Sequence, residues 1–334
     1  MLLRGPADLP FPPFRERFPW FGADLQTLRN TLRRTTPSLA QYASQQLRFP
    51  CTDGSGDILL GTLNTPLHAG QKPLLVLVHG LTGSEDSSHI LVSATYFLAQ
   101  GYPTLRLNQR GAGPSRATCR GHYHAGRSDD LATVLSALPA SLTPHGICVM
   151  AVSLGANMML KCLAEYPRFP TLRAAVAVSP PVDLAASQRQ IMQRRNWVYH
   201  RYLLQRMKDG ADWAELIEKV SPDVLAGVHT IYDFDDKIVA PANDFADAPD
   251  YYRQCSALQF LDAIDTPTLI IHPQDDPWVP TTPLAKRNWD SHQPGHTHVS
   301  VLLPTHGGHI GLHGRGSAVP WHNLCADVFF THTN

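Results

Sequence analysis

The sequence predicts an α/β fold in which a mostly parallel, eight-stranded sheet is flanked by helices. Short, continuous apolar runs such as Pro73–Val78 (PLLVLV) are typical of strands that are buried on both faces. Segments with helical periodicity, such as His89–Gln100, follow these runs along the chain. Strands that alternate with helices at this spacing form parallel sheets through right-handed crossovers. At 334 residues, the chain is long enough to bury a large core.

Eight segments qualify as strands, and helices are expected between them. The first two, Gln46–Phe49 and Ile58–Leu63, flank a loop with the sequence DGSG, so an antiparallel hairpin is expected. The later strands are expected at Pro73–Val78, Thr104–Leu107, Ile147–Met150, Ala174–Val178, Thr268–His272 and Val299–Leu303. The helices between them are expected at His89–Gln100, Ser128–Leu138 and Ala156–Ala164.

Residues 1–45 precede the first strand and are expected to form an N-terminal arm packed on the main domain. They hold a Pro/Phe/Trp-rich entry (Phe11–Phe21) and a polar stretch with helical character near Asp24–Arg34. The aromatic side chains offer this arm large apolar surfaces for packing. A partly ordered terminus is the alternative.

Residues 181–261 follow the sixth strand and interrupt the alternation of strands and helices. They are rich in Arg, Tyr, Trp and Asp and contain the helical patterns Ile191–Met207 and Trp213–Lys219. A helical cap inserted into the core accounts for this segment, which leaves residues 46–180 and 262–334 as the core. Elongated helices of the core itself are the alternative.

The composition excludes several functional classes. Lys and Arg together number 28, as do Asp and Glu, so no nucleic-acid partner is expected. The longest apolar runs fall far short of the ~20 residues that a membrane-spanning helix needs. Charge and proline interrupt the N-terminal apolar residues too early for a secretory signal. The six cysteines are scattered without a C-x-x-C pair, which favours reduced thiols in a cytoplasmic protein.

One stretch, Gly146–Gly155 (GICVMAVSLG), combines a buried strand, a sharp turn and the start of a helix. Ser153 stands at the apex, with the small residues Ala151 and Gly155 two positions to either side. This is the pattern of a nucleophile elbow, in which the serine adopts a strained backbone conformation and its small neighbours let strand and helix pass closely. The motif is A-x-S-x-G rather than G-x-S-x-G, and a serine in an ordinary loop is the alternative.

A serine nucleophile needs a base, and the base needs a carboxylate to orient it. In the α/β-hydrolase fold these residues follow in the order Ser, Asp or Glu, His, each at the carboxyl end of a strand. Asp275 and Asp276 come just past the seventh strand, and the spacing favours Asp276. His309 follows a Gly-Gly pair just past the last strand and is favoured over His306. The predicted triad is therefore Ser153, Asp276 and His309.

Acyl transfer also requires backbone N–H donors where the oxyanion forms. The N–H of Leu154, which follows the nucleophile and opens a helix, is the first expected donor. The N–H of Leu81, in the loop after Pro73–Val78, is the second. In the same loop, His79 is expected to orient the backbone by hydrogen bonding, with a part in proton transfer as the alternative. His79 is also a candidate for a substrate contact.

Other side chains are candidates for substrate contacts or for a metal. Trp197 and Tyr252 are candidates for lining an acyl pocket, with packing inside the cap as the alternative. Tyr123 is expected to brace the loop beneath the site, with a substrate contact as the alternative. His306, His309 and His313 have metal-like spacing, but the glycines between them indicate a loop. Arg110–Gly113 lacks the residues of a nucleotide-binding loop. Neither a metal nor a cofactor is therefore expected.

Longer motifs extend these patterns over nearly the whole chain. They are HGLTGSEDSSH (79–89), NQRGAGPS (108–115), YHAGRSDDL (123–131), AVSLGAN (151–157), VSPPVDL (178–184), RRNWVYHRYLL (194–204), YDFDD (232–236), DYY (250–252), DDPWVP (275–280) and HGGHIG (306–311). In these motifs the chain resembles the YheT-like α/β-hydrolases, whose relatives include yeast medium-chain fatty-acid ethyl ester synthase/esterases. The resemblance implies the same triad that the spacing favours. One departure, at Ala112-Gly113, concerns no catalytic residue.

The motifs and the resemblance together imply a serine esterase that acts on carboxylic esters with short- to medium-chain acyl groups. The expected route is an acyl-enzyme on Ser153 that is hydrolysed by water activated by His309. An acyltransferase or ester synthase, a lipase or thioesterase, and a non-catalytic binding protein of this fold are the alternatives. The expected partner is a small ester with an aliphatic acyl chain. Peripheral contact with a membrane is compatible with the sequence, and no pattern indicates an oligomeric state.

Overall fold

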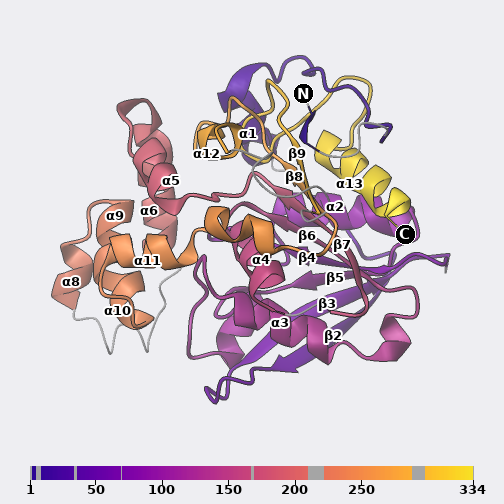
Figure 1. The fold of residues 1–334 in the computed structure, drawn as a ribbon, viewed down its shortest axis with the longest axis horizontal. Coiled ribbons are helices and arrows are strands. Elements are labelled where there is room, and N and C mark those ends of the chain that lie inside the picture. The colour runs from indigo at the N-terminus through magenta and orange to yellow at the C-terminus, as the bar shows by residue number, and fades with distance from the viewer. Residues whose placement is uncertain are drawn as a thin grey trace.

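The structure is a computed structural model that describes residues 2–4, 9–33, 36–68, 70–166, 169–209, 222–287 and 298–333. Within these described ranges, one sheet of nine strands has helices on both faces (Figure 1). The strands are β1 (Leu2–Arg4), β2 (Ala43–Pro50), β3 (Ile58–Thr65), β4 (Leu74–Val78), β5 (Thr104–Leu107), β6 (Ile147–Val152), β7 (Leu172–Val178), β8 (Thr268–Ile271) and β9 (Val299–Leu302). Their spatial order is β1-β9-β8-β7-β6-β4-β5-β3-β2.

The six strands from β4 to β9 are parallel to one another, and β1, β2 and β3 pair antiparallel with their neighbours. All eight predicted strands are present, which confirms the predicted fold class. A ninth strand, β1, pairs with the outer edge of β9, with Leu2 opposite Leu302. This strand could not be predicted from the sequence, because three residues show no periodicity and such a strand forms only along an open edge supplied by another strand.

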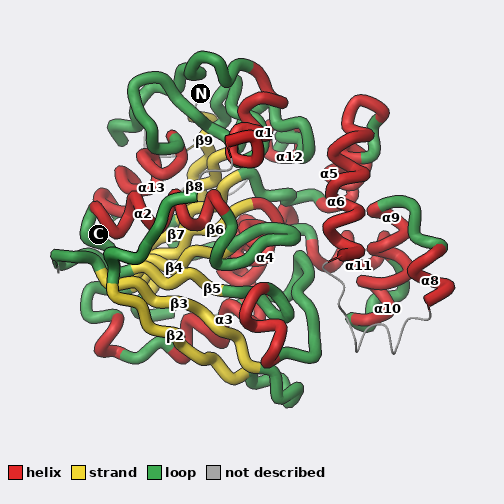
Figure 2. The backbone as a smooth tube through the Cα atoms, turned by 180° about the vertical axis from the view of Figure 1, so that it is seen from behind, coloured by secondary structure: helices red, strands yellow, loops and turns green. Residues whose placement is uncertain are grey.

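Each face of the sheet is covered by two long helices (Figure 2). Helices α3 (Ser128–Ala137) and α4 (Ser153–Glu165) cover one face, and α2 (Ser88–Ala99) and α13 (Trp321–His332) cover the other. Side chains alternate along β4, so that Val76 belongs to the first apolar layer and Leu77 to the second. The central strands are buried on both faces, as their continuous apolar runs predict.

Between β7 and β8, the described residues 184–209 and 222–255 form a group of helices at one side of the molecule (Figure 1). This segment is named the cap here, and it contains α5 (Leu184–Ile191), α6 (Trp197–Asp209), α8 (Pro222–Ala226), α9 (Ile231–Phe234), the π-helix Asp235–Val239, α10 (Ala240–Ala242) and α11 (Ala248–Cys255). Its side chains build an apolar cluster of their own around Leu203, Met207 and Phe234. The expected helix at Trp213–Lys219 lies outside the described residues.

Shorter helical turns complete the fold. They are the 3₁₀ segments Gly113–Thr118, Ala140–Leu142, Arg194–Asn196 and Ala257–Ala263, and the four-residue helix α12 (Thr282–Ala285). Among the described residues, no helix combines the length and the apolar character that crossing a bilayer demands.

The N-terminal arm packs on the core. Its helix α1 (Gly22–Arg33) coincides with the predicted helical stretch. Phe14 lies against Trp321 of α13, with 5.5 Å between the ring centroids. The indole N–H of Trp321 also donates a hydrogen bond to the carbonyl oxygen of Pro12 (2.6 Å). The arm is therefore tied to the C-terminal helix before it reaches α1.

Candidate active site

Ser153 lies at the sharp turn between β6 and α4, with a backbone φ of 50°. A non-glycine residue in this left-handed region stores strain, as a nucleophile elbow requires. A side chain at Gly155 would place its Cβ only 2.2 Å from the carbonyl oxygen of His79, so this position admits no side chain. Ala151, by contrast, lies within β6, where its methyl group is fully buried in the apolar layer beneath α4. The first small residue of the motif therefore tolerates alanine, and the second must be glycine.

The structure brings the three predicted triad residues together. Asp276 follows β8 and His309 follows β9, so both lie at the carboxyl edge of the sheet beside the elbow. Nε2 of His309 is 3.0 Å from Oγ of Ser153, and its Nδ1 is 2.7 Å from Oδ2 of Asp276. With Nδ1 protonated and donating to the carboxylate, Nε2 is free to accept the serine proton.

The carboxylate of Asp276 is completely buried and fully hydrogen-bonded. Its Oδ1 accepts the backbone N–H groups of Trp278 (2.9 Å) and Val279 (3.0 Å). Burial alone would raise its pKa, but the charge of His309 and hydrogen bonds from His272 and His309 hold the pKa below the usual range for Asp. Asp276 is therefore ionised at neutral pH and able to orient the imidazole.

Asp275 points elsewhere. Its Oδ1 accepts the backbone N–H of Gly308 (2.9 Å), and its Oδ2 lies 3.4 Å from Nδ1 of His306. These contacts brace the loop that carries His309 without touching its imidazole. The alternative pair Asp275 and His306 thus lies beside the predicted triad and away from Ser153.

Two residues near the triad received no role in the sequence analysis. His272, at the end of β8, is buried, and its Nε2 lies 3.4 Å from Oδ2 of Asp276 and 3.2 Å from the carbonyl oxygen of Val279. The indole of Trp278 stacks on the imidazole of His309, with 4.6 Å between centroids and 29° between planes. Both lie within six residues of Asp276 in the sequence. This closeness was the only feature of the sequence that could have indicated that they belong to the site.

The two expected oxyanion donors flank the nucleophile. Leu154 is the second residue of α4, where backbone N–H groups have no partner within the helix. Leu81 follows Gly80, at which an added Cβ would lie 2.9 Å from Cβ of Ser153, so the loop after β4 lies directly against the elbow. Both leucines line the same cavity as Ser153 and His309. Their role as donors remains a prediction.

A cavity of about 800 Å³ opens above the triad. Cap residues form much of its wall, including Leu203, Met207 and Phe234. The core contributes polar groups such as Ser87, just before α2, and His89, in the first turn of α2. The cavity lining therefore combines apolar side chains of the cap with polar side chains of the core.

The four predicted substrate contacts fall into two groups. Tyr123 and Tyr252 line the cavity, but their hydroxyl groups already bond to the protein: Tyr123 accepts the backbone N–H of Thr82 (2.6 Å), and Tyr252 donates to Asp235 (2.6 Å). His79 is fully buried behind the loop, where Gln109 donates to its carbonyl oxygen, and it is not part of the cavity wall.

Trp197 does not line the cavity, so its predicted substrate contact is corrected. Its side chain is 58% exposed at the start of α6 and carries the guanidinium of Arg201 above its ring at 5.0 Å. The aromatic pattern of residues 194–204 indicated a helix but not which of its faces turns inward. That face is set by contacts with the core, because the ring of Tyr199 packs against that of Trp278 with 5.4 Å between the ring centroids.

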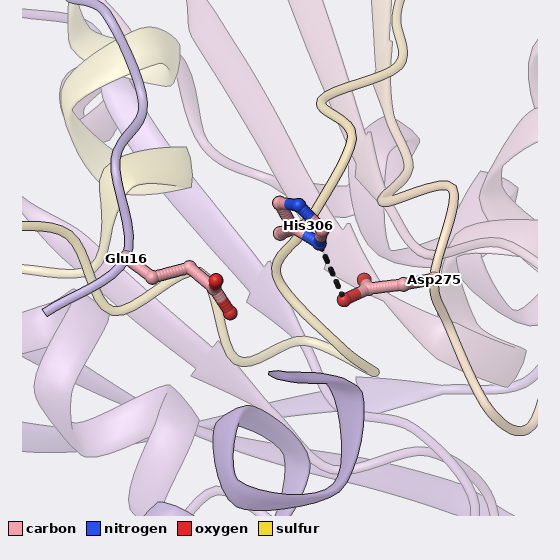
Figure 3. Close-up of side chains that lie close together, drawn as sticks. All are labelled: Glu16, Asp275 and His306. Atoms are coloured by element: carbon pink, nitrogen blue, oxygen red, sulfur yellow. Dashed lines mark ion pairs between the residues drawn. The ribbon is translucent and has the colours of Figure 1, made fainter. Parts of the chain in front are cut away.

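One group of ligand-type side chains converges among the described residues: Glu16, Asp275 and His306, whose ligand atoms lie within 4.8 Å of one another (Figure 3). This group differs from His306, His309 and His313, whose spacing in the sequence is similar to that of metal ligands. Oε1 of Glu16 accepts the backbone N–H of Gly22 at the start of α1 (2.6 Å). Asp275 holds Gly308, as described above. The Glu16 carboxylate thus already holds the arm, and the Asp275 carboxylate already holds the His309 loop.

Proteins with related sequences and structures agree with this geometry. A family model described as serine aminopeptidase, S33 (Hydrolase_4) matches residues 69–288. The chain belongs to this α/β-hydrolase family. It is 35% identical over 297 residues to the Escherichia coli protein named "Putative esterase YheT", covering 87% of this chain and 84% of that protein. The predicted YheT-like resemblance is thereby confirmed.

More distant relatives carry esterase and lipase names. A Saccharomyces cerevisiae monoacylglycerol lipase is 28% identical over 222 residues, which cover 62% of this chain and 49% of the lipase. The structure also matches a Pyrococcus furiosus esterase with a TM-score of 0.58 at 16% identity, covering 89% of this chain and 93% of that one. This structural likeness shows the fold. The chain is an esterase- and lipase-type α/β-hydrolase, a class of enzymes that cleave carboxylic esters.

Proposed function

We propose that this enzyme hydrolyses carboxylic esters with short- to medium-chain aliphatic acyl groups, through a triad of Ser153, His309 and Asp276. One observation carries the proposal: the hydrogen-bonded chain from Oγ of Ser153 through the imidazole to the buried carboxylate opens into a cavity with an apolar wall. Such a chain activates a serine hydroxyl that is otherwise a poor nucleophile at neutral pH.

The reaction starts with attack of Ser153 Oγ on the ester carbonyl carbon, while the hydroxyl proton moves to Nε2 of His309. Asp276 stabilises the imidazolium that forms, and the N–H groups of Leu81 and Leu154 bind the oxyanion. Collapse of the tetrahedral intermediate breaks the ester bond, and the departing alcohol takes the proton from His309. Water then repeats the sequence at the acyl-enzyme and releases the carboxylic acid.

The cavity favours an uncharged acyl chain on the cap side. Seven apolar side chains of the cap line the cavity: Leu184, Ile191, Leu203, Met207, Ile231, Phe234 and Val239. Each methylene that such a wall removes from water contributes about 0.8 kcal/mol to binding. The polar wall on the core side, with Ser87, Ser88 and His89, suits the alcohol part of the ester. The same acyl-enzyme can be intercepted by an alcohol in place of water, which yields ester synthesis.

The test is labelling by a fluorophosphonate probe together with hydrolysis of p-nitrophenyl esters from acetate to decanoate. The wild type should react with the probe and hydrolyse the esters, and Ser153→Ala should do neither. A wild type that resists the probe and hydrolyses none of these esters would leave a binding protein of this fold as the better description. Matched ester, thioester and amide substrates separate the esterase from a thioesterase or amidase, and added alcohol detects acyl transfer.

A further inference from the structure

We propose that Thr27, on helix α1 of the N-terminal arm, is a positioning residue for His309. This inference rests on the proposed function, because it assigns to the arm the task of holding the catalytic base. The backbone N–H of His309 donates to Oγ1 of Thr27 (2.9 Å), and the Thr27 hydroxyl donates to the carbonyl oxygen of Ala23 (2.7 Å). The hydroxyl therefore links the helix backbone directly to the backbone of His309.

A second side chain of α1 grips the same loop four residues further on. Gln26 is fully buried; its Oε1 accepts the backbone N–H of His313 (2.7 Å), and its Nε2 donates to the carbonyl oxygens of His313 (3.2 Å) and Trp20 (2.6 Å). Its amide thus pairs with both backbone groups of His313. Gln26 and Thr27 together fasten the two ends of the segment from His309 to His313.

The loop is shaped to fit closely against α1. A Cβ at Gly308 would lie 2.4 Å from the carbonyl oxygen of Ala23, and one at Gly311 would lie 2.5 Å from that of Gln26. The two glycines therefore let loop and helix touch backbone to backbone. The G-G-H-I-G pattern follows from contact with the arm as well as from the turn itself.

The His309 loop needs such an external hold. Ile310 and Leu312 have positive φ values of 57° and 51°, conformations that cost non-glycine residues energy unless the surroundings impose them. The imidazole must also keep its hydrogen-bond distance to Ser153, since a displacement of about 1 Å is enough to reduce catalysis roughly 100-fold. Bonds from α1 to the loop backbone supply this constraint.

Helix α1 also contacts the cap. Oδ1 of Asp24 accepts the hydroxyl of Tyr199 (2.9 Å), and Oδ2 pairs with Arg195 (3.1 Å). Leu28 packs against the apolar cluster of the cap. Helix α1 thus lies between cap and His309 loop, and it contributes Thr27, Asn30 and Thr31 to the cavity wall.

The experiment replaces Thr27 by valine, which keeps the branched shape and removes the hydroxyl. The kcat for a p-nitrophenyl ester should fall about tenfold with KM within about twofold, and the rate of fluorophosphonate labelling should fall in parallel, because both reactions use His309 as the base. Thr27→Ser, which keeps the hydroxyl, should restore most of kcat. Thr27→Ala, which removes the hydroxyl without adding bulk, should repeat the loss.

Thr95 of α2 provides a matched control. Its hydroxyl donates to the carbonyl oxygen of Leu91, four residues earlier (2.8 Å), as that of Thr27 donates to Ala23, but it contacts neither the triad nor the cavity. Thr95→Val should keep wild-type kcat. The inference is overturned if Thr27→Val and Thr27→Ala keep wild-type kcat, if Thr27→Ser is as impaired as they are, or if only KM rises. A wild type without probe labelling and ester hydrolysis would instead refute the proposed function.

Discussion

Nδ1 of His309 lies 2.7 Å from Oδ2 of Asp276, whose side chain is completely shielded from solvent. The carboxylate comes from the loop after β8 and the imidazole from the loop after β9, so the contact depends on two neighbouring parallel strands ending at the same edge. Two backbone N–H groups hold the other carboxylate oxygen in place. The carboxylate is therefore held in one position, and it favours the tautomer of His309 that carries its proton on Nδ1.

Replacing Asp276 by asparagine should reduce kcat about 10³- to 10⁴-fold. The amide can still accept the two backbone N–H groups, but it no longer stabilises the imidazolium and favours the wrong tautomer. Steady-state kinetics with a p-nitrophenyl ester measure the effect. Asp275→Asn is the matched control, because Asp275 contacts Gly308 and His306 but not the imidazole of His309. A loss as large in Asp275→Asn would contradict the assignment.

Gly155→Ala should destabilise the protein and impair catalysis together. The added Cβ would lie 2.2 Å from the carbonyl oxygen of His79, so α4 must move away from the loop after β4. Overpacking of this kind costs about 1–3 kcal/mol, and the shift also displaces Ser153 from the donors in that loop. Denaturant unfolding and ester kinetics report the two effects. Ala151→Gly, which restores the usual motif, should leave kcat within about twofold of the wild type.

The stability of the protein should fall as the pH drops below about 6.5, because several histidines are buried in their neutral form. Burial lowers the pKa of His322 to about 3, and the nearby His89 adds to this shift. The folded protein then keeps His322 neutral, while the unfolded chain binds a proton below its ordinary pKa of about 6.5. The contribution to stability is complete above that pKa and is lost as the pH falls toward the folded value. Each such histidine adds about 1.4 kcal/mol per pH unit to the slope.

The variant His322→Gln separates this effect from general acid denaturation. The free energy of unfolding is measured in denaturant at several pH values between about 4.5 and 7.5. Its slope against pH should be smaller in the variant than in the wild type, by an amount that corresponds to about one bound proton. His332, which lies exposed near the end of the same helix, offers the control variant His332→Gln. Equal slopes in His322→Gln and wild type would show that His322 takes no part in the linkage.

Filling the apolar wall of the cavity should change the preferred acyl chain. Leu203→Phe adds volume on the cap side, so hydrolysis of decanoate esters should fall while that of acetate esters stays near the wild-type rate. Each methylene that is excluded from the wall lowers kcat/KM about fourfold, from about 0.8 kcal/mol of lost transfer energy. Trp197→Ala, outside the cavity on the same helix, should leave the profile unchanged. A profile that responds to Trp197→Ala alone would place the acyl chain elsewhere.

Much of the fold was predictable because it depends on local patterns. Runs of four to six mostly apolar residues identified the central strands, and the turn around Ser153 was recognisable because its steric demands act over five consecutive residues. The order of Asp276 and His309 after two later strands completed a triad that the structure places within hydrogen-bond distance. The spacing favoured Asp276 over Asp275, and in the structure it is Asp276 that lies within hydrogen-bond distance of the His309 imidazole.

Other features arise only from contacts between segments far apart in the chain. Nothing near Thr27 in sequence indicates that its hydroxyl meets His309, which is 282 residues away. The pairing of β1 with β9 and the outward turn of Trp197 also depend on which surfaces meet. Periodicity records that a helix has an apolar face, but the partner of that face, and hence the part of the arm that supports the catalytic loop, is set by packing.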